Sequence, residues 1–125
     1  MTTPADELRT AAETMRRLAS EATPGPWRQH DTHLWQYGHT ATVLSGEGNE
    51  TDLRAWLPSQ SQESWDETRN VWNDAAYIAA MHPGVGAALA ELLETAANYY
   101  ASDAIGHPTH LVRALAVARA VNAAA

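Results

Sequence analysis

The segment Thr23-Pro24-Gly25-Pro26-Trp27 decides the fold, because it ends a strong helical pattern and begins a different one. Two prolines around a glycine cannot continue a helix, and Trp27 adds a large apolar side chain that carries an N–H donor. We therefore expect an N-terminal helix, a joint at this segment, and a short aromatic-rich region after it.

The residues before the joint predict a helix over 4–21. Thr3 precedes Pro4 and lies three residues before Asp6, an order typical of an N-cap, a first-turn proline and an acid near the positive end of a helix. Apolar residues then recur at spacings of three and four from Leu8 to Ala22.

The residues after the joint predict a small antiparallel sheet over 27–58. Short aromatic or β-branched stretches at 27–30, 34–37, 40–45 and 53–57 are separated by polar or glycine-rich turns, and Pro58 ends the last one. Three or four strands are expected, and so small a sheet must pack against helices. Strand alternation places Trp27 and Arg28 on opposite faces, and likewise Arg54 and Ala55.

The remaining sequence predicts a three-helix segment over 63–122. Ser64 and Glu67 match a capping box, His82-Pro83-Gly84 ends the first helix and begins the second, and Pro108 begins the third. The whole pattern predicts one α+β domain over 1–125, with an N-terminal helix, a small sheet of three or four strands, and three C-terminal helices.

The composition narrows the classes of function. A net charge of −7 with scattered acids argues against a nucleic-acid binder, and the absence of cysteine excludes disulfides and thiol chemistry. No apolar run approaches the ~20 residues that span a bilayer, and the first residues lack the pattern of a secretory signal. We expect a cytoplasmic protein with no nucleic-acid or membrane partner.

The aromatic sheet is the best candidate for a binding site. Phenylalanine is absent, whereas five tryptophans and four tyrosines supply rings with a polar edge. Indoles stack on planar groups and guanidinium groups bind phosphates, so this region suits a nucleotide-like ligand. The same residues also suit plain packing of a sheet on helices. The predicted ligand-binding residues are Arg28, Trp35, Tyr37, Arg54 and Trp56.

The histidines suggest two weaker hypotheses. His30-Asp31-Thr32-His33 and His107-Pro108-Thr109-His110 resemble the paired His-x-Thr elements of two-histidine phosphoesterases, in which each histidine is an acid or base. The second copy lies at a predicted helix start, where capping explains it better. A metal cluster that includes His39 lacks a convincing ligand spacing, so we expect no metal, no cofactor and no assigned catalytic residue. The Gly84-Val85-Gly86 segment offers helix N–H groups to an anion, although a plain turn also explains it.

The joint, followed by the predicted strands and then by Asn73-Asp74-Ala75-Ala76-Tyr77-Ile78-Ala79-Ala80-Met81-His82-Pro83, resembles small phage and prophage accessory proteins of the Ead/Ea22-like type from high-GC actinobacterial viruses. The resemblance covers roughly residues 5–120. It implies a non-essential accessory protein, made early in infection and acting in the host cytoplasm, often against host defence. It implies no catalytic residue.

We interpret the shared motifs as structural. Pro26 and Trp27 are expected to pack on the Ala75–Ile78–Ala79 face of the second helix, while Asn73 or Asp74 bonds to the proline-glycine loop. The motif residues are Pro24, Gly25, Pro26, Trp27, Asn73, Asp74 and Tyr77.

The leading functional hypothesis is a non-enzymatic accessory protein that binds or sequesters a small nucleotide-like ligand. A protein-interaction module that inhibits a host factor is the alternative, and a phosphoesterase-like enzyme is the third. Alanine-rich helices permit close approach between chains, which favours a homodimer.

Overall fold

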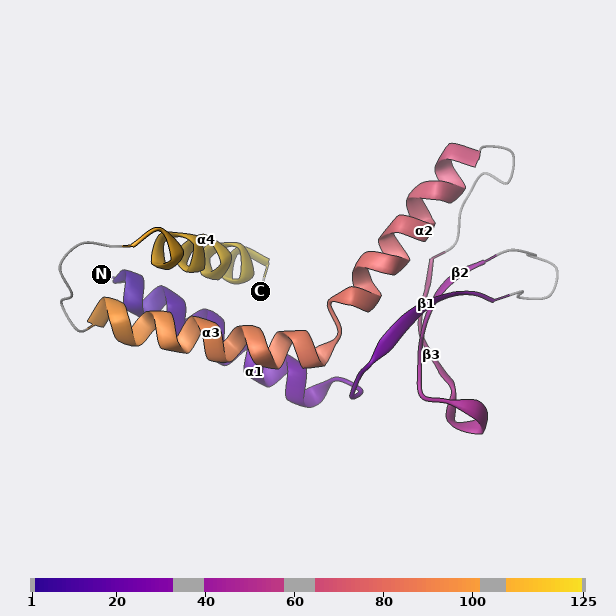
Figure 1. The fold of residues 1–125 in the computed structure, drawn as a ribbon, viewed down its shortest axis with the longest axis horizontal. Helices are drawn as coiled ribbons and strands as arrows, with labels where there is room; N and C mark the ends of the chain where they lie inside the picture. Colours follow the sequence, from indigo (N-terminus) through magenta and orange to yellow (C-terminus); the bar gives the residue numbers. More distant parts are fainter. Residues whose placement is uncertain (1, 33–39, 58–64, 102–107, 125) are drawn as a thin grey trace. The chain divides into compact units, whose positions relative to one another are not determined.

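The computed structural model describes residues 2–32, 40–57, 65–101 and 108–124, with the backbone alone for 65–70 and 101. These residues form an α+β fold with an N-terminal helix, a three-stranded antiparallel sheet and then three helices, which confirms the predicted class (Figure 1). The elements are α1 (Pro4–Glu21), β1 (Trp27–Asp31), β2 (Ala41–Ser45), a 3-10 turn (Gly48–Glu50), β3 (Asp52–Leu57), α2 (Trp65–Ala80), α3 (Pro83–Ala101) and α4 (Thr109–Ala124).

The chain divides into two compact units, each with its own core. The helical unit comprises Met1–Ala22 and Val85–Ala125, and the sheet unit comprises Thr23–Gly84. The predicted stretch at 34–37 lies outside the described residues.

Helix α1 begins and ends where the sequence predicts. The Thr3 hydroxyl accepts a hydrogen bond from the Asp6 amide at 3.1 Å, and the Asp6 carboxylate accepts one from the Thr3 amide at 3.2 Å. This reciprocal cap satisfies N–H groups that have no partner inside the helix. The bond from the Thr3 amide is the main reason why the pKa of Asp6 lies below its usual value.

The core of the helical unit joins α1, α3 and α4. Leu8 and Leu93 are its largest fully buried side chains, and alanines fill the space between the helices. The buried members are Leu8, Ala11 and Ala12 from α1, Leu93, Ala96 and Ala97 from α3, and Leu111, Ala114, Leu115 and Ala118 from α4. Small residues let these helices approach closely, and leucines supply most of the buried apolar surface.

Polar contacts tie the same helices together at the surface of the helical unit. Arg16 on α1 forms an ion pair with Glu94 on α3, and Arg119 on α4 forms one with Glu7 on α1. The Asn122 side-chain amide also donates to the Glu7 carbonyl oxygen at 3.0 Å. These exposed ion pairs orient the helices and stabilise the unit little, because solvent screens them.

The sheet has the order β1-β2-β3, with β2 in the centre. Trp27 pairs with Ser45, and His30 pairs with Thr42. Thr42 in turn pairs with Trp56 on β3. The register shifts between Val43 and Leu44, which pair with Ala55 and Leu53, so Arg54 is an extra residue in a β-bulge.

Helix α2 covers one face of the sheet. Ala41 and Val43 of β2 share a buried cluster with Ala75 and Ala79 of α2. Partly buried side chains surround this cluster: Trp27, Ala55, Leu57, Val71, Trp72 and Ile78. The packing supplies the apolar contact that a three-stranded sheet needs for stability.

Neighbouring leucines of α3 provide a test of the helical core. Leu93 is fully buried, whereas Leu92 is 59% exposed. We expect Leu93→Ala to lower the free energy of unfolding by about 2–5 kcal/mol, through lost burial and the cavity left behind. Leu92→Ala, the matched control, should cost under about 1 kcal/mol.

The two variants are compared by urea denaturation, followed by far-UV circular dichroism. Because all five tryptophans lie in the sheet unit, tryptophan fluorescence follows that unit separately. Equal destabilisation by the two substitutions would contradict the core assignment.

Candidate binding surface

The face of the sheet opposite α2 is the strongest candidate for a functional surface. Since Ala41 and Val43 pack against α2, alternation turns Thr42 and Leu44 to the other side. Their partners across the ladder point the same way. We call this side the outer face, and its residues are Arg28, His30, Thr42, Leu44, Leu53 and Trp56.

The outer face is apolar along β3 and polar along β1, and its residues on the central strand β2 are buried. Trp56 is 42% exposed and Leu53 is 45% exposed, while Leu44 between the edge strands is buried. Thr42 is fully buried, and its hydroxyl donates to the His30 carbonyl oxygen at 2.9 Å. Trp56 and Leu53 together give this face exposed apolar area, which is a common mark of interaction surfaces.

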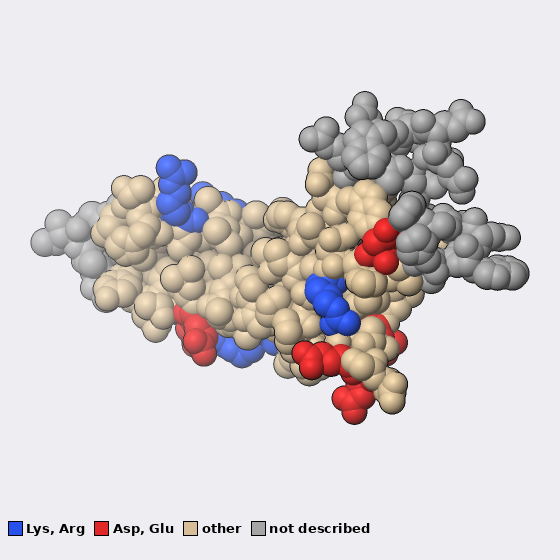
Figure 2. Space-filling view, turned by 45° about the vertical axis from the view of Figure 1, so that its right-hand side comes forward, with Lys and Arg blue, Asp and Glu red and all other residues tan. Residues whose placement is uncertain are grey.

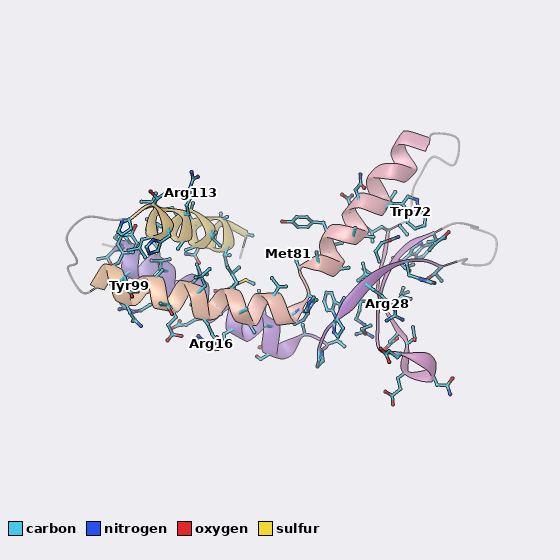
Figure 3. The ribbon with its side chains drawn as sticks, in the orientation of Figure 1. Arg16, Arg28, Trp72, Met81, Tyr99 and Arg113 are labelled. Atoms are coloured by element: carbon cyan, nitrogen blue, oxygen red, sulfur yellow. The ribbon has the colours of Figure 1, made fainter. Side chains whose placement is uncertain are left out.

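Arg28 supplies a positive charge at the edge of the outer face. Its Nη1 donates to the Gly46 carbonyl oxygen at 2.6 Å (Arg28 is labelled in Figure 3). Among the described residues Arg28 has no carboxylate partner, whereas Arg54 is paired with Asp52. An exposed, unpaired guanidinium group is available to a carboxylate or phosphate of a partner.

Arg54 belongs to a different part of the sheet unit. Its guanidinium group bonds to Asp52 at 2.5 Å and to the Thr23 hydroxyl at 2.5 Å. Asp52 pairs with Ser45 and so shares the face of Trp27. The expectation that Arg54 and Ala55 face opposite sides rested on regular alternation, which the bulge at Arg54 interrupts. We therefore leave Arg54 out of the candidate surface.

Trp27 is a packing residue. It lies against the cluster that contains Ala75 and Ala79, as the motif interpretation predicted, and its indole N–H donates to the Thr23 carbonyl oxygen at 3.2 Å. Trp72 reaches the same cluster from α2 (Figure 3).

The expected bond from Asn73 or Asp74 to the proline-glycine loop stays a prediction. Asn73, Asp74 and Tyr77 are exposed on α2, Tyr77 by 71%. Of the described side chains, His82 contacts Gly25 of the loop. Pro24 and Pro26 are exposed, and the Gly25–Pro26 peptide bond is cis.

Several predicted residues lie outside the described part of the chain. These are Trp35, Tyr37, His33, His39 and His107. The pairing of His30 with His107 that a phosphoesterase needs therefore has only one described member. His30 itself is exposed on the outer face.

Acidic side chains border the outer face at the turn between β2 and β3. Glu47 and Glu50 are exposed in this turn, which follows Gly46, and the Gly46 carbonyl oxygen accepts a hydrogen bond from Arg28. In Figure 2 the charges on the visible described surface form small separate groups of both signs within a mostly uncharged area. Within the described residues, the outer face and the turn beside it therefore combine the positive charge of Arg28 with negative charges of the turn and with the apolar side chains of β3.

The helical unit carries a second candidate, an apolar groove of about 320 Å³ between α1 and α4. Its lining has no charged residue, and Leu18 on its rim is 46% exposed. The lining residues are Thr14, Met15, Leu18, Ala120, Val121 and Ala124.

Sequence reasoning missed Leu53 as a surface residue. In an alternating strand Leu53 shares the side of Ala55 and Leu57, which pack against α2. The bulge at Arg54 is what turns Leu53 to the outer face. No local signal marks that bulge in the sequence, since neither glycine nor proline occurs in β3.

Comparisons with protein-family models, curated proteins and solved structures gave no match to this chain. The likeness to the phage accessory proteins therefore stays a prediction, and the candidate surface is argued from its own geometry.

The two arginines of the sheet unit differ in their expected effect on stability. Arg54→Met removes charge-assisted hydrogen bonds to Asp52 and Thr23, and should lower the free energy of unfolding by about 1–3 kcal/mol. Arg28→Met should change it by about 0.5 kcal/mol or less, because its side chain is exposed. Urea denaturation followed by tryptophan fluorescence measures both. A larger loss for Arg28→Met would show that Arg28 is structural.

Proposed function

We propose that this chain is a non-enzymatic binding protein that contacts a protein partner through the outer face of its sheet. The observation that supports this proposal is the grouping of exposed Trp56 and Leu53 on one side of the sheet with Arg28, which has no carboxylate partner among the described residues. Protein interfaces combine an apolar or aromatic centre with a polar rim, and tryptophan and arginine dominate their binding energy.

The charges around the surface favour a polypeptide over a phosphate-bearing ligand. A phosphate bound at Arg28 would lie near the turn that carries Glu47 and Glu50, and these acids would repel it. A protein can present an acidic side chain to Arg28 and a basic one to the turn at the same time. The mixed charge therefore adds specificity for a partner of complementary pattern.

A nucleotide-like ligand is the second candidate, favoured by Arg28 and Trp56. An unpaired guanidinium group and an exposed indole on one face are the two groups that such a ligand would use, for its phosphate and its base. Trp35, Tyr37 and Arg54 complete the original hypothesis, but Arg54 is already bonded to Asp52 and Thr23.

The biological setting of the proposal comes from the resemblance to phage accessory proteins. We propose that the chain acts in the cytoplasm of an infected actinobacterial host and interferes with a host factor, for example in anti-phage defence. Within the described residues, no single helix combines the length and apolar composition needed to cross a bilayer. A homodimer that presents two outer faces is part of the same proposal.

Substitution of Trp56 provides the direct test. A tagged chain is expressed in an actinobacterial host, and the proteins that co-purify are quantified by mass spectrometry. We expect one host protein to be enriched with the wild-type chain and at least tenfold less with Trp56→Ala. A buried interface tryptophan typically contributes about 2 kcal/mol or more. The purified pair is then measured by isothermal titration, with Arg28→Ala as the second variant.

Tyr77→Ala is the matched control, because Tyr77 is a large, exposed aromatic residue on α2 and outside the outer face. It should retain the partner. A partner bound equally well by Trp56→Ala would contradict the proposed surface. Isothermal titration with cyclic dinucleotides and ADP-ribose distinguishes a protein partner from a nucleotide-like ligand. Binding heat with the wild-type chain that is absent with Trp56→Ala would favour the nucleotide-like ligand.

A further inference from the structure

His82 lies beside both places where the chain passes between its two compact units. The chain leaves the helical unit after Ala22 and returns to it after Gly84. The side chain of His82 contacts Gly25, three residues after the first passage, and Gly84, at the second. All three residues belong to the sheet unit.

The polar contact of His82 caps a helix. Helix α2 ends as the Met81 amide bonds back to the carbonyl oxygens of Tyr77 and Ile78, and α3 begins at Pro83. The Gly84 amide then donates to Nδ1 of His82 at 3.1 Å. First-turn amides have no partner inside their helix, so His82 supplies one from the N-cap position. This bond occupies the Gly84 N–H that an anion would otherwise use.

The steric contact of His82 explains two glycines. A Cβ atom on Gly25 would lie 2.4 Å from Nδ1 of His82, and one on Gly84 would lie 2.7 Å from Cε1. Both distances are far below van der Waals contact. Gly25 and Gly84 are therefore needed for the space that the imidazole ring fills, unlike Gly46, whose φ of 77° itself favours glycine.

The loop that contains Gly25 also bonds to the sheet through Thr23. The Thr23 carbonyl oxygen accepts the Trp27 indole N–H, and the Thr23 hydroxyl bonds to Arg54 of β3. The loop is thus bonded to the sheet through Thr23. The ring of His82 contacts both this loop at Gly25 and the first turn of α3 at Gly84.

We propose that the side chain of His82 couples the loop that contains Gly25 to the first turn of α3 at Gly84. The hydrogen bond at Gly84 and the packing on Gly25 are then lost together, in one step. The coupling requires one side chain to bond at Gly84 while it packs on Gly25. A substitution at Gly25 should then weaken the hydrogen bond of the Gly84 amide, although the two residues are distant in sequence.

Amide hydrogen exchange, measured by NMR, tests the coupling. Gly25→Ala forces the imidazole away, and we expect the exchange rate of the Gly84 amide to rise at least tenfold. His82→Ala should raise exchange both at Gly84 and in residues 23–27. His82→Asn keeps an acceptor atom near the position of Nδ1 and should restore part of the Gly84 protection.

Gly48→Ala is the control for backbone strain. Gly48 has a φ of 57° and open space around its Cβ position, so alanine strains the turn without touching His82. It should leave exchange at Gly84 unchanged. Circular dichroism and tryptophan fluorescence confirm that each variant is folded.

Two results would overturn the proposal: unchanged Gly84 exchange in folded Gly25→Ala, or His82→Ala loosening Gly84 but not residues 23–27. If Gly25→Ala does not fold, the comparison of His82→Ala with His82→Asn decides in the same way.

Discussion

The contact of α2 with one face of the sheet is the constraint on which the candidate surface depends. Ala75 and Ala79 meet Ala41 and Val43, and these small side chains let the helix backbone approach the strands closely. A sheet of three short strands is not stable without such cover. Once this face is used for packing, any binding role of the strands falls to the opposite face, and the register decides which residues stand there.

Local signals predicted the elements of the fold well, because most boundaries are set by nearby residues. The cap of Thr3 with Asp6 begins α1, and Pro83 begins α3 directly after α2. The bulge at Arg54 has no such signal, since it follows from pairing with β2 and from bonds to Asp52 and Thr23. Features that depend on partners far along the chain were therefore the ones that sequence pattern alone did not predict.

The sequence predicted which types of residue form the candidate surface, but it did not predict which individual tryptophan and arginine residues lie there. Trp27 and Trp56 both lie in short strands, and their neighbouring residues do not distinguish the two. Trp27 nevertheless packs against α2, whereas Trp56 lies on the outer face. Arg28 and Arg54 differ in a similar way: among the described residues Arg28 bonds only to a backbone carbonyl oxygen, whereas Arg54 is paired with the carboxylate of Asp52. Strand register and the bulge make these assignments, and both are properties of the folded ladder.

The two sequence motifs, residues 23–27 and 73–83, meet at Gly25 and His82, which gives them a structural connection within this chain. One motif supplies the glycine that leaves room for the ring, and the other supplies the ring and the start of α3. Neither motif contains Arg28, Leu53 or Trp56. The contacts of these two motifs stabilise the fold. Any specificity for a partner would then depend on residues outside the motifs. The residues of the outer face are therefore not fixed by the contact between the two motifs.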